Sequence, residues 1–114
     1  MASVDENKKR KIDTKPDPLQ GLRAELDALD NQLVITLAKR LQQCDLIARV
    51  KREHGIPMMQ PHRIDYVRER CAALGRAHDV SPDFIVDIYK LIIAETCRRE
   101  DLIIDSAPEA GAGS

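Results

Sequence analysis

Apolar residues recur at helical spacing in three stretches of the chain, and prolines and glycines stand between these stretches. A polar residue followed by proline is typical of a helix start, and we read such starts at Asp17 with Pro18, Gln60 with Pro61, and Ser81 with Pro82. Glycine, which is common just beyond a helix end, follows the first two stretches at Gly55 and Gly75. We therefore predict helices over about 18–54, 61–74 and 82–105, and an all-α fold.

The first predicted helix is long for a chain of 114 residues. At 1.5 Å per residue it extends about 55 Å, whereas a compact domain of this size has a radius of gyration of about 13 Å. Four leucines follow the 4-3-4 spacing of a coiled-coil seam: Leu22, Leu26, Leu29 and Leu33. One monomer cannot bury such a helix, so we predict a homodimer built on it.

Two cations interrupt the apolar row of this helix. Continuing the row past Leu33 places Arg40 where an apolar residue is expected, and Lys51 follows 11 residues later. That spacing is nearly three turns, so both side chains lie on one side of the helix, about 16 Å apart along its axis. Leaning toward each other, they can hold a small dianion. Alternatively, both reach solvent or pair with acids of another helix, and the periodicity leaves both interpretations open.

The third predicted helix carries two polar residues, Thr96 and Glu100, in an otherwise apolar stripe. Because a buried carboxylate is costly without a partner, we expect Glu100 to face a cation or to hold its proton with a raised pKa. Arg63, just after the second helix start, places a third cation close to the loop that follows Lys51. These polar side chains are the candidates for a functional site.

Composition and charge exclude several classes of protein. Aromatic residues make up only 3% of the chain, which argues against a β-sandwich or barrel. The net charge of −1 does not favour binding to nucleic acid or to an anionic membrane. Any anion-binding site must therefore depend on a local group of cations. No apolar run approaches the roughly 18 residues of a membrane span, and polar residues follow Met1. We therefore expect a soluble, cytoplasmic protein.

The ends of the chain are expected to be disordered over 1–16 and 106–114, around a helical domain over 17–105. The basic run 8–11 resembles a nuclear-import signal or a phosphate-binding arm, but we prefer a solvated tail. Cys44, Cys71 and Cys97 lack the spacing of zinc or redox motifs, and we interpret them as small buried hydrophobic residues. With no metal site and no placed nucleophile predicted, an enzyme of this sequence would act through positioning and electrostatics.

Several short motifs follow one another in a characteristic order along the predicted helices. They are Leu22-Arg23, Ala28-Leu29-Asp30, Leu37-Ala38-Lys39-Arg40, Val50-Lys51, Arg63, Leu74-Gly75-Arg76-Ala77-His78 and Leu91-Ile92-Ile93. Their order and spacing resemble the all-helical (type II) class of chorismate mutase over residues 18–105. The resemblance implies an intertwined homodimer of three helices per subunit with two equivalent, shared active sites. It also implies an isomerase of aromatic biosynthesis that needs no cofactor and no metal.

The resemblance also assigns roles to individual residues. Arg23 matches an arginine that reaches into the partner's site, whereas Arg40, Lys51 and Arg63 match cations of the same subunit's site. Thr96 takes the position of a small hydroxyl residue that contacts a substrate carboxylate. Glu100 matches a Gln or Glu aimed at the ether oxygen of the substrate. The implied catalytic groups are Lys51, Glu100 and Arg40, acting on a [3,3] rearrangement of a dicarboxylate of the chorismate type.

Two positions depart from the pattern of the family. Where its best-known members carry acids around the C4 hydroxyl of chorismate, this chain has Gln60 and Ile64. The segments 56–61 and 100–102 are similar to those of 4-amino-4-deoxychorismate mutases of antibiotic pathways, so either chorismate or its 4-amino analogue is the expected substrate. Isochorismate-pyruvate lyases also lack the acid, which keeps that activity as an alternative. A helical dimer without catalytic activity is the rival from another class.

Overall fold

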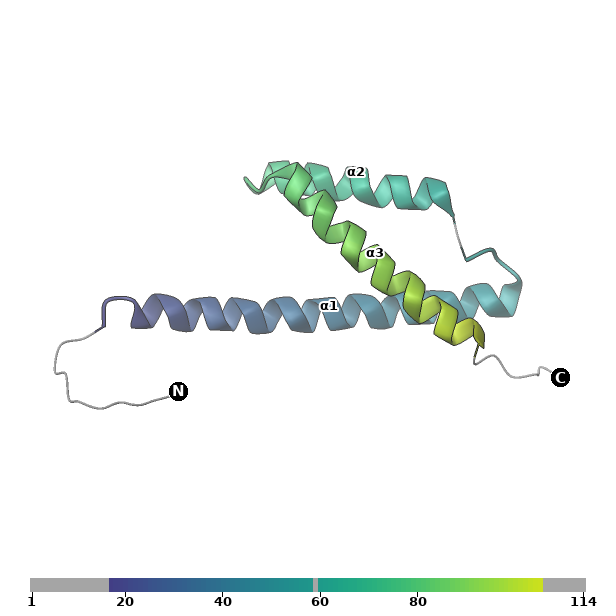
Figure 1. Ribbon diagram of the computed structural model, residues 1–114, viewed down its shortest axis with the longest axis horizontal. Helices are drawn as coiled ribbons and strands as arrows, with labels where there is room; N and C mark the ends of the chain where they lie inside the picture. The colour runs from purple at the N-terminus through teal and green to yellow at the C-terminus, as the bar shows by residue number, and fades with distance from the viewer. Residues whose placement is uncertain (1–16, 59, 106–114) are drawn as a thin grey trace. The chain divides into compact units, whose positions relative to one another are not determined.

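The computed structural model describes residues 17–58 and 60–105 and contains three helices in this part of the chain (Figure 1). These are α1 (Gln20–His54), α2 (Pro61–Ala77) and α3 (Pro82–Asp105). The predicted all-α fold is confirmed. The predicted tails, including the basic run 8–11, lie outside the described residues. Among the described helices, none combines the length and the apolar character needed to cross a membrane.

The start of α1 lies two residues later than predicted. Asp17 Oδ1 accepts a hydrogen bond from the Leu19 backbone N–H at 2.9 Å, and the Asp17 carbonyl accepts one from Gln20 at 3.2 Å. Asp17 therefore closes a turn through Pro18 and Leu19, and the helix begins only after that turn at Gln20. The proline after a polar residue located the helix start approximately, but the hydrogen bonds accepted by the Asp17 side chain and carbonyl set the first helical residue.

The end of α1 is the one predicted from Gly55. Gly55 adopts a φ of 65°, and the backbone N–H of Ile56 donates to the Lys51 carbonyl at 2.8 Å. A hydrogen bond from the N–H of the residue after a left-handed glycine to a carbonyl of the last helical turn defines the Schellman motif. The last turn of the helix contains the basic residues Lys51, Arg52 and His54. Basic residues at this end complement the negative end of the helix dipole.

Gly75 does not end α2, contrary to the prediction. The helix continues to Ala77, and its Schellman bond runs from the Val80 N–H to the Gly75 carbonyl at 2.8 Å. Asp79, with a φ of 58°, takes the left-handed position in place of glycine. Gly75 serves close packing instead, since a Cβ there would lie 3.0 Å from Ile85 Cγ1 of α3 and 3.0 Å from the Val80 carbonyl oxygen.

The start of α3 follows the sequence signal closely. Ser81 Oγ accepts a hydrogen bond from the Phe84 backbone N–H at 3.2 Å, which is the bond expected of an N-cap serine. Pro82 is the first helical residue, and Asp83 lies in the first turn near the positive end of the helix dipole. With Gly75 packed against Ile85, α2 and α3 form an antiparallel hairpin.

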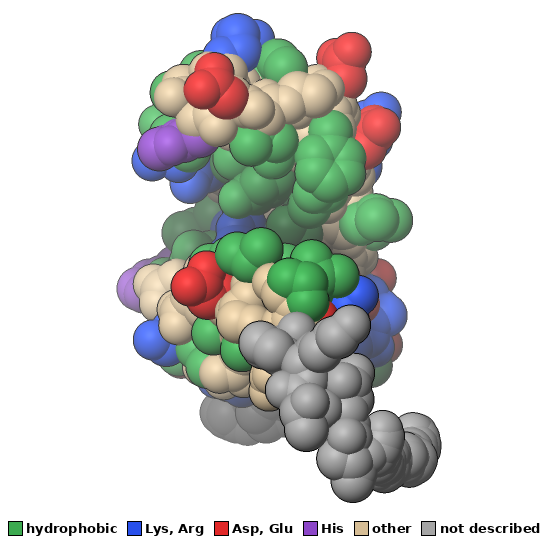
Figure 2. Space-filling model, turned by 90° about the vertical axis from the view of Figure 1, so that its left-hand side faces the viewer, with side chains coloured by type: hydrophobic (Ala, Val, Ile, Leu, Met, Phe, Trp, Pro, Cys, Tyr) green, Lys and Arg blue, Asp and Glu red, His purple; other side chains and the backbone are tan. Residues whose placement is uncertain are grey.

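The chain divides into two units, 1–38 and 39–114. In the described part of the first unit, the leucine seam of α1 is open to solvent: Leu22, Leu26, Leu29 and Leu33 are 56–66% exposed. In the second unit, hydrophobic side chains are also exposed, Leu91 by 74%. Hydrophobic side chains at the surface are visible in Figure 2. Among the described hydrophobic residues only Ala48 and Cys71 are buried, so the described part of a single chain has almost no buried core.

Candidate active site

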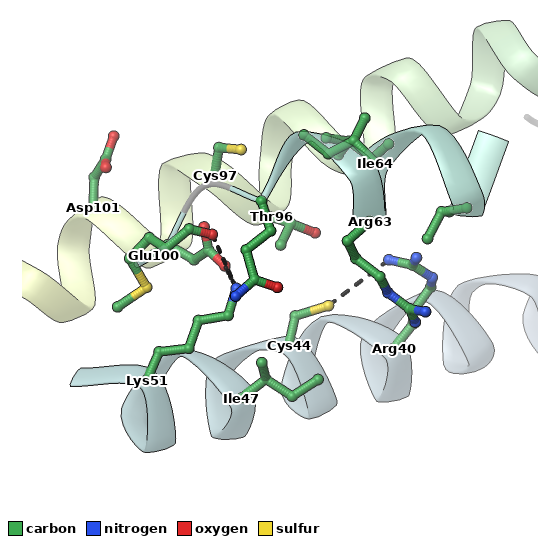
Figure 3. A pocket seen from close by; sticks show the side chains of 14 residues that line it. Arg40, Cys44, Ile47, Lys51, Arg63, Ile64, Thr96, Cys97, Glu100 and Asp101 are labelled. Carbon is green, nitrogen blue, oxygen red and sulfur yellow. Dashed lines mark hydrogen bonds and ion pairs between the residues drawn. The ribbon is translucent and has the colours of Figure 1, made fainter. Parts of the chain in front are cut away.

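The second unit contains a cavity of about 380 Å³ bordered by α1, α2, α3 and the loop between α1 and α2 (Figure 3). Seven of the eight side chains predicted to bind substrate border this cavity: Arg40, Lys51, Gln60, Arg63, Ile64, Thr96 and Glu100. The fold thus brings together polar residues that are far apart in the sequence. The structure shows that these side chains border one cavity, and their roles in a reaction remain predictions.

Two arginines supply positive charge to the cavity. The guanidinium of Arg40 lies 5.3 Å from the centre of the Tyr89 ring and donates a long hydrogen bond of 3.8 Å to Cys44 Sγ. The guanidinium of Arg63 lies 5.0 Å from the centre of the Tyr66 ring. Within the described residues, neither guanidinium forms an ion pair with a carboxylate. Their remaining N–H donors are therefore available to an anionic ligand.

A second cavity, of about 270 Å³, shares both arginines with the first. Arg70 adds a third guanidinium to its lining, beside the Tyr66 and Tyr89 rings. No acidic residue is found among the described residues that border this second cavity. Positive charge is thus concentrated where the two cavities meet, which favours binding of a ligand with more than one carboxylate.

Lys51 faces Glu100 within the first cavity (Figure 3). Lys51 Nζ lies 3.8 Å from Glu100 Oε2 and donates a hydrogen bond of 2.9 Å to the Met58 carbonyl. The two side chains are only 16% and 13% exposed. Because an ammonium has three N–H donors, Lys51 retains donors for a ligand while Met58 and Glu100 hold it in place.

The protonation of Glu100 is set mainly by burial. Burial raises the pKa of Glu100 above its ordinary value, Lys51 opposes the rise, and Asp101 adds to it. The sequence left open whether burial or the neighbouring cations would dominate, and in the structure burial does. Glu100 therefore keeps its proton to higher pH than an exposed glutamate, and in that form its O–H can donate a hydrogen bond.

Thr96 borders the same cavity from α3, one turn before Glu100. Its hydroxyl donates a hydrogen bond of 3.0 Å to the Ile92 carbonyl of its own helix. The threonine oxygen can still accept a hydrogen bond. To donate to a substrate carboxylate, as the resemblance implies, the hydroxyl would exchange its bond to Ile92 for the ligand.

Gln60 and Ile64 border the cavity from the first turn of α2. Gln60 is the N-cap residue of this helix, but its side chain makes no capping hydrogen bond. The amide of Gln60 is therefore not committed to the helix end. Ile64 is half-buried and presents only hydrocarbon to the cavity.

Arg23 is the one predicted site residue that does not border the cavity. It belongs to the first unit, its side chain is 68% exposed, and its Nη1 lies 4.0 Å from Asp17 Oδ2. A contact at that distance between exposed groups contributes little. Within the described part of one chain, the predicted site is therefore incomplete.

Sequence reasoning missed several groups that border the cavity. Cys44 and Cys97 are half-buried and line it, so only Cys71 fits the prediction of a buried cysteine. Their positions give a signal in retrospect: Cys44 lies one turn after Arg40, and Cys97 follows Thr96. The Met58 carbonyl, which holds Lys51, had no such signal because a backbone acceptor depends on loop conformation rather than on residue type.

The cavity offers three cations, the carboxyl groups of Glu100 and Asp101, of which Glu100 has a raised pKa, and apolar walls from Ile47, Val67 and Ile93. This combination suits a small, partly apolar dianion. In the part of the chain that the structure describes, there is no cluster of three or more His, Cys, Asp or Glu side chains that could hold a metal ion.

Comparison with known proteins agrees with this chemistry. Residues 22–101 match the family described as chorismate mutase type II. The chain is 46% identical over 91 residues to a 4-amino-4-deoxychorismate mutase of Streptomyces venezuelae, across 80% of this chain and 88% of that protein. A 4-amino-4-deoxychorismate mutase of Streptomyces pristinaespiralis is 47% identical over 85 residues, across 75% of this chain and 66% of that protein.

A more distant relative is the T-protein of Haemophilus influenzae, which is 33% identical over 84 residues. The aligned region covers 73% of this chain but only 22% of that protein. The resemblance seen in the order of short sequence motifs is confirmed by a family match that covers most of the helical region. This chain belongs to the chorismate mutase type II family.

Proposed function

We propose that this chain catalyses the [3,3] rearrangement of 4-amino-4-deoxychorismate to the corresponding prephenate, and that chorismate is the poorer substrate. The observation that carries the proposal is the convergence of Arg40, Arg63, Lys51 and Glu100 on one cavity. The family match and the two Streptomyces relatives named for this activity support the same reaction.

The reaction is unimolecular and balances within one substrate molecule. The ether C–O bond breaks while a C–C bond forms, and no atom or electron enters or leaves. The protein needs to hold the enolpyruvyl arm over the ring and to stabilise the negative charge that develops on the ether oxygen. Both tasks require placed hydrogen-bond donors rather than a nucleophile.

Arg40 is proposed to bind one substrate carboxylate, ideally through two parallel N–H bonds. Lys51 and the protonated Glu100 are proposed to donate toward the ether oxygen. The geometry supports this pairing, since Lys51 Nζ and Glu100 Oε2 lie 3.8 Å apart and both groups are largely shielded from water. Arg63 adds positive potential, and Thr96 lies beside Glu100 for a further carboxylate contact.

The second carboxylate is proposed to bind the partner subunit's Arg23 in a homodimer with two shared sites. Three features support an assembly of this kind. Arg23 does not border the cavity of its own chain, the leucine seam beside it is 56–66% exposed, and a single chain has almost no buried core. A second copy would cover the seam and complete the site.

Preference for the 4-amino substrate is proposed to arise on the α2 side of the cavity. Gln60 and Ile64 present an amide and a hydrocarbon group, so no carboxylate stands there to accept a hydrogen bond from a C4 hydroxyl. A substrate hydroxyl that lacks a carboxylate acceptor loses about 1–3 kcal/mol relative to a site that provides one. The neutral amide oxygen of Gln60 can accept a hydrogen bond from either C4 substituent, so it does not create the preference.

The test is an ultraviolet assay of substrate loss, run side by side with chorismate and 4-amino-4-deoxychorismate. We expect turnover of both, with the larger kcat/KM for the amino substrate, and loss of activity in Lys51→Ala. Ile64→Glu should shift the ratio of kcat/KM values toward chorismate by roughly 5- to 100-fold, because it restores an acceptor. No turnover of either compound by the folded dimer contradicts the proposal, and release of pyruvate from isochorismate indicates a lyase instead.

A further inference from the structure

The pair Lys51 and Glu100 lies on two different helices, so its geometry depends on how α1 and α3 are held together. Two polar contacts join these helices on either side of the pair. Arg99, the residue directly before Glu100, donates from Nε to Asp45 Oδ1 at 3.0 Å and from Nη2 to Asp45 Oδ2 at 2.5 Å. Asp45 lies on α1, six residues before Lys51.

The second contact is at the other side of the pair. Arg52, directly after Lys51, donates from Nη1 to the Ile103 carbonyl at 2.9 Å. Ile103 lies in the last turn of α3, at the negative end of the helix dipole. A guanidinium that donates to a carbonyl there complements this end of the dipole.

Both contacts are suited to fixing a distance. The Arg99 and Asp45 side chains are 32% and 18% exposed and meet through two bonds in the fork geometry of guanidinium and carboxylate. The Arg99 guanidinium holds the pKa of Asp45 below its ordinary value, so the pair stays charged at neutral pH. Such a pair resists both sliding and rotation of α3 on α1, which a single apolar contact does not.

We propose that Arg99 and Arg52 are positioning residues, which hold α3 against α1 through Asp45 and the Ile103 carbonyl so that Glu100 faces Lys51 at the distance the reaction requires. Neither arginine borders the cavity. Their effect on turnover is therefore exerted through Lys51 and Glu100, and the inference rests on the function proposed above for that pair.

The chain offers a matched control for Arg99. Its neighbour Arg98 also forms a two-bond pair with a carboxylate, with distances of 2.8 Å and 2.6 Å to Glu95. That pair lies within one turn of α3 and joins no second helix. Arg98→Ala removes the same kind of bond from the same helix but leaves the contact between α1 and α3 intact.

The kinetic test compares Arg99→Ala, Asp45→Asn and the double variant with Arg98→Ala, each as the full chain. We expect kcat to fall by about 10- to 100-fold in the first three. KM should change by less than about twofold, since Arg40 and Arg63 do not depend on this contact. The double variant should be no worse than either single one, because both remove one interaction. Arg99→Lys should recover part of kcat, and Arg52→Ala should repeat the pattern more weakly.

A second readout does not need activity: the pKa of Glu100, followed by NMR of its carboxyl carbon in the folded chain. The charged groups bordering its cavity are Arg40 and Lys51 from α1, Arg63 from α2 and Asp101 from α3. Burial is the largest cause of the raised pKa, so a looser α3 should move the pKa toward its ordinary value in Arg99→Ala and not in Arg98→Ala.

The outcomes separate the two proposals. An inactive wild-type protein whose Glu100 pKa still responds to Arg99→Ala contradicts the proposed function and keeps the positioning role. An unchanged kcat and an unchanged Glu100 pKa in folded Arg99→Ala overturn the positioning role. Equal losses of kcat in Arg98→Ala and Arg99→Ala, or additive losses in the double variant, also overturn it.

Discussion

Among single residues, the arginine side chains of this chain have different contacts and different proposed roles. Arg40 and Arg63 lie over tyrosine rings and form no ion pair with a carboxylate within the described residues, whereas Arg99 uses two donors on Asp45. The difference lies in the partner, since an aromatic face leaves the edge of the guanidinium unoccupied and a carboxylate does not. Position in the fold, rather than residue type, separates the arginines proposed to bind substrate from an arginine that joins two helices.

Glu100 leads to a prediction on pH dependence. Its proposed active form is the protonated acid, and its folded pKa is raised, chiefly by burial. As pH rises through that pKa, the donor to the ether oxygen is lost and a negative charge appears beside it. The kcat of the wild type should therefore fall on the alkaline side by up to about tenfold per pH unit. This limb should lie above the ordinary pKa of glutamate, about 4.3.

The measurement is kcat from about pH 5 to pH 9 for the wild type and for Glu100→Gln. A glutamine amide donates at any pH, so the variant should lack the alkaline limb. Retention of the same limb in the variant assigns the titration to another group, and a flat wild-type profile across this range contradicts the role of Glu100 as a titrating donor.

At the scale of elements, the structure explains why one helix end was predicted correctly and another was not. Both Gly55 and Gly75 looked like residues beyond a helix end. Gly55 takes the left-handed conformation and ends α1, whereas Asp79 takes it at the end of α2. Gly75 is needed because α3 and the 78–81 turn approach its backbone closely, and this approach depends on tertiary packing.

Gly75 gives a prediction on stability. In Gly75→Ala the new Cβ would meet Ile85 Cγ1 and the Val80 carbonyl oxygen, both at 3.0 Å. Because the Val80 oxygen is a backbone atom of the 78–81 turn, the turn and Ile85 must shift to admit the Cβ, and we expect a loss of about 1–3 kcal/mol in the free energy of unfolding. The matched control is Gly21→Ala in the first turn of α1, where no atom lies within 4 Å of the added Cβ.

Chemical unfolding at a fixed protein concentration provides the comparison, because the stability of an oligomer depends on concentration. Gly21→Ala should be neutral or stabilising, since alanine favours a helix over glycine by about 1 kcal/mol. Equal stability of Gly75→Ala and the wild type would contradict the close packing of Gly75 against Ile85 and the 78–81 turn.

Across the whole molecule, the chain exposes more hydrophobic surface than a stable single subunit normally does. Large hydrophobic residues such as Leu22, Leu29 and Leu91 are 64–74% exposed, and among the described hydrophobic residues only Ala48 and Cys71 are buried. In the proposed homodimer, burial of this surface would contribute to the free energy of folding. The proposed shared site therefore links activity to assembly.

Mixing two inactive variants tests the shared site. Arg23→Ala and Arg40→Ala each remove one carboxylate-binding arginine from both sites of a homodimer. After subunit exchange, one site of each mixed dimer regains both arginines, so an equal mixture should recover about a quarter of wild-type activity. Labelled subunits confirm the exchange, and the unmixed variants set the baseline. Verified exchange without recovery rules out a site shared in this way.

Local signals along the chain predicted the three helices, most of their ends and most of the polar residues that border the cavity. These signals are local, because proline, cap residues and apolar periodicity act within a few turns of helix. Three other features follow from tertiary packing alone: burial prevails over Lys51 at Glu100, the Met58 carbonyl holds Lys51, and Arg99 joins α3 to Asp45. Each of these depends on distances between segments far apart in the sequence, and desolvation and hydrogen bonding change steeply with such distances.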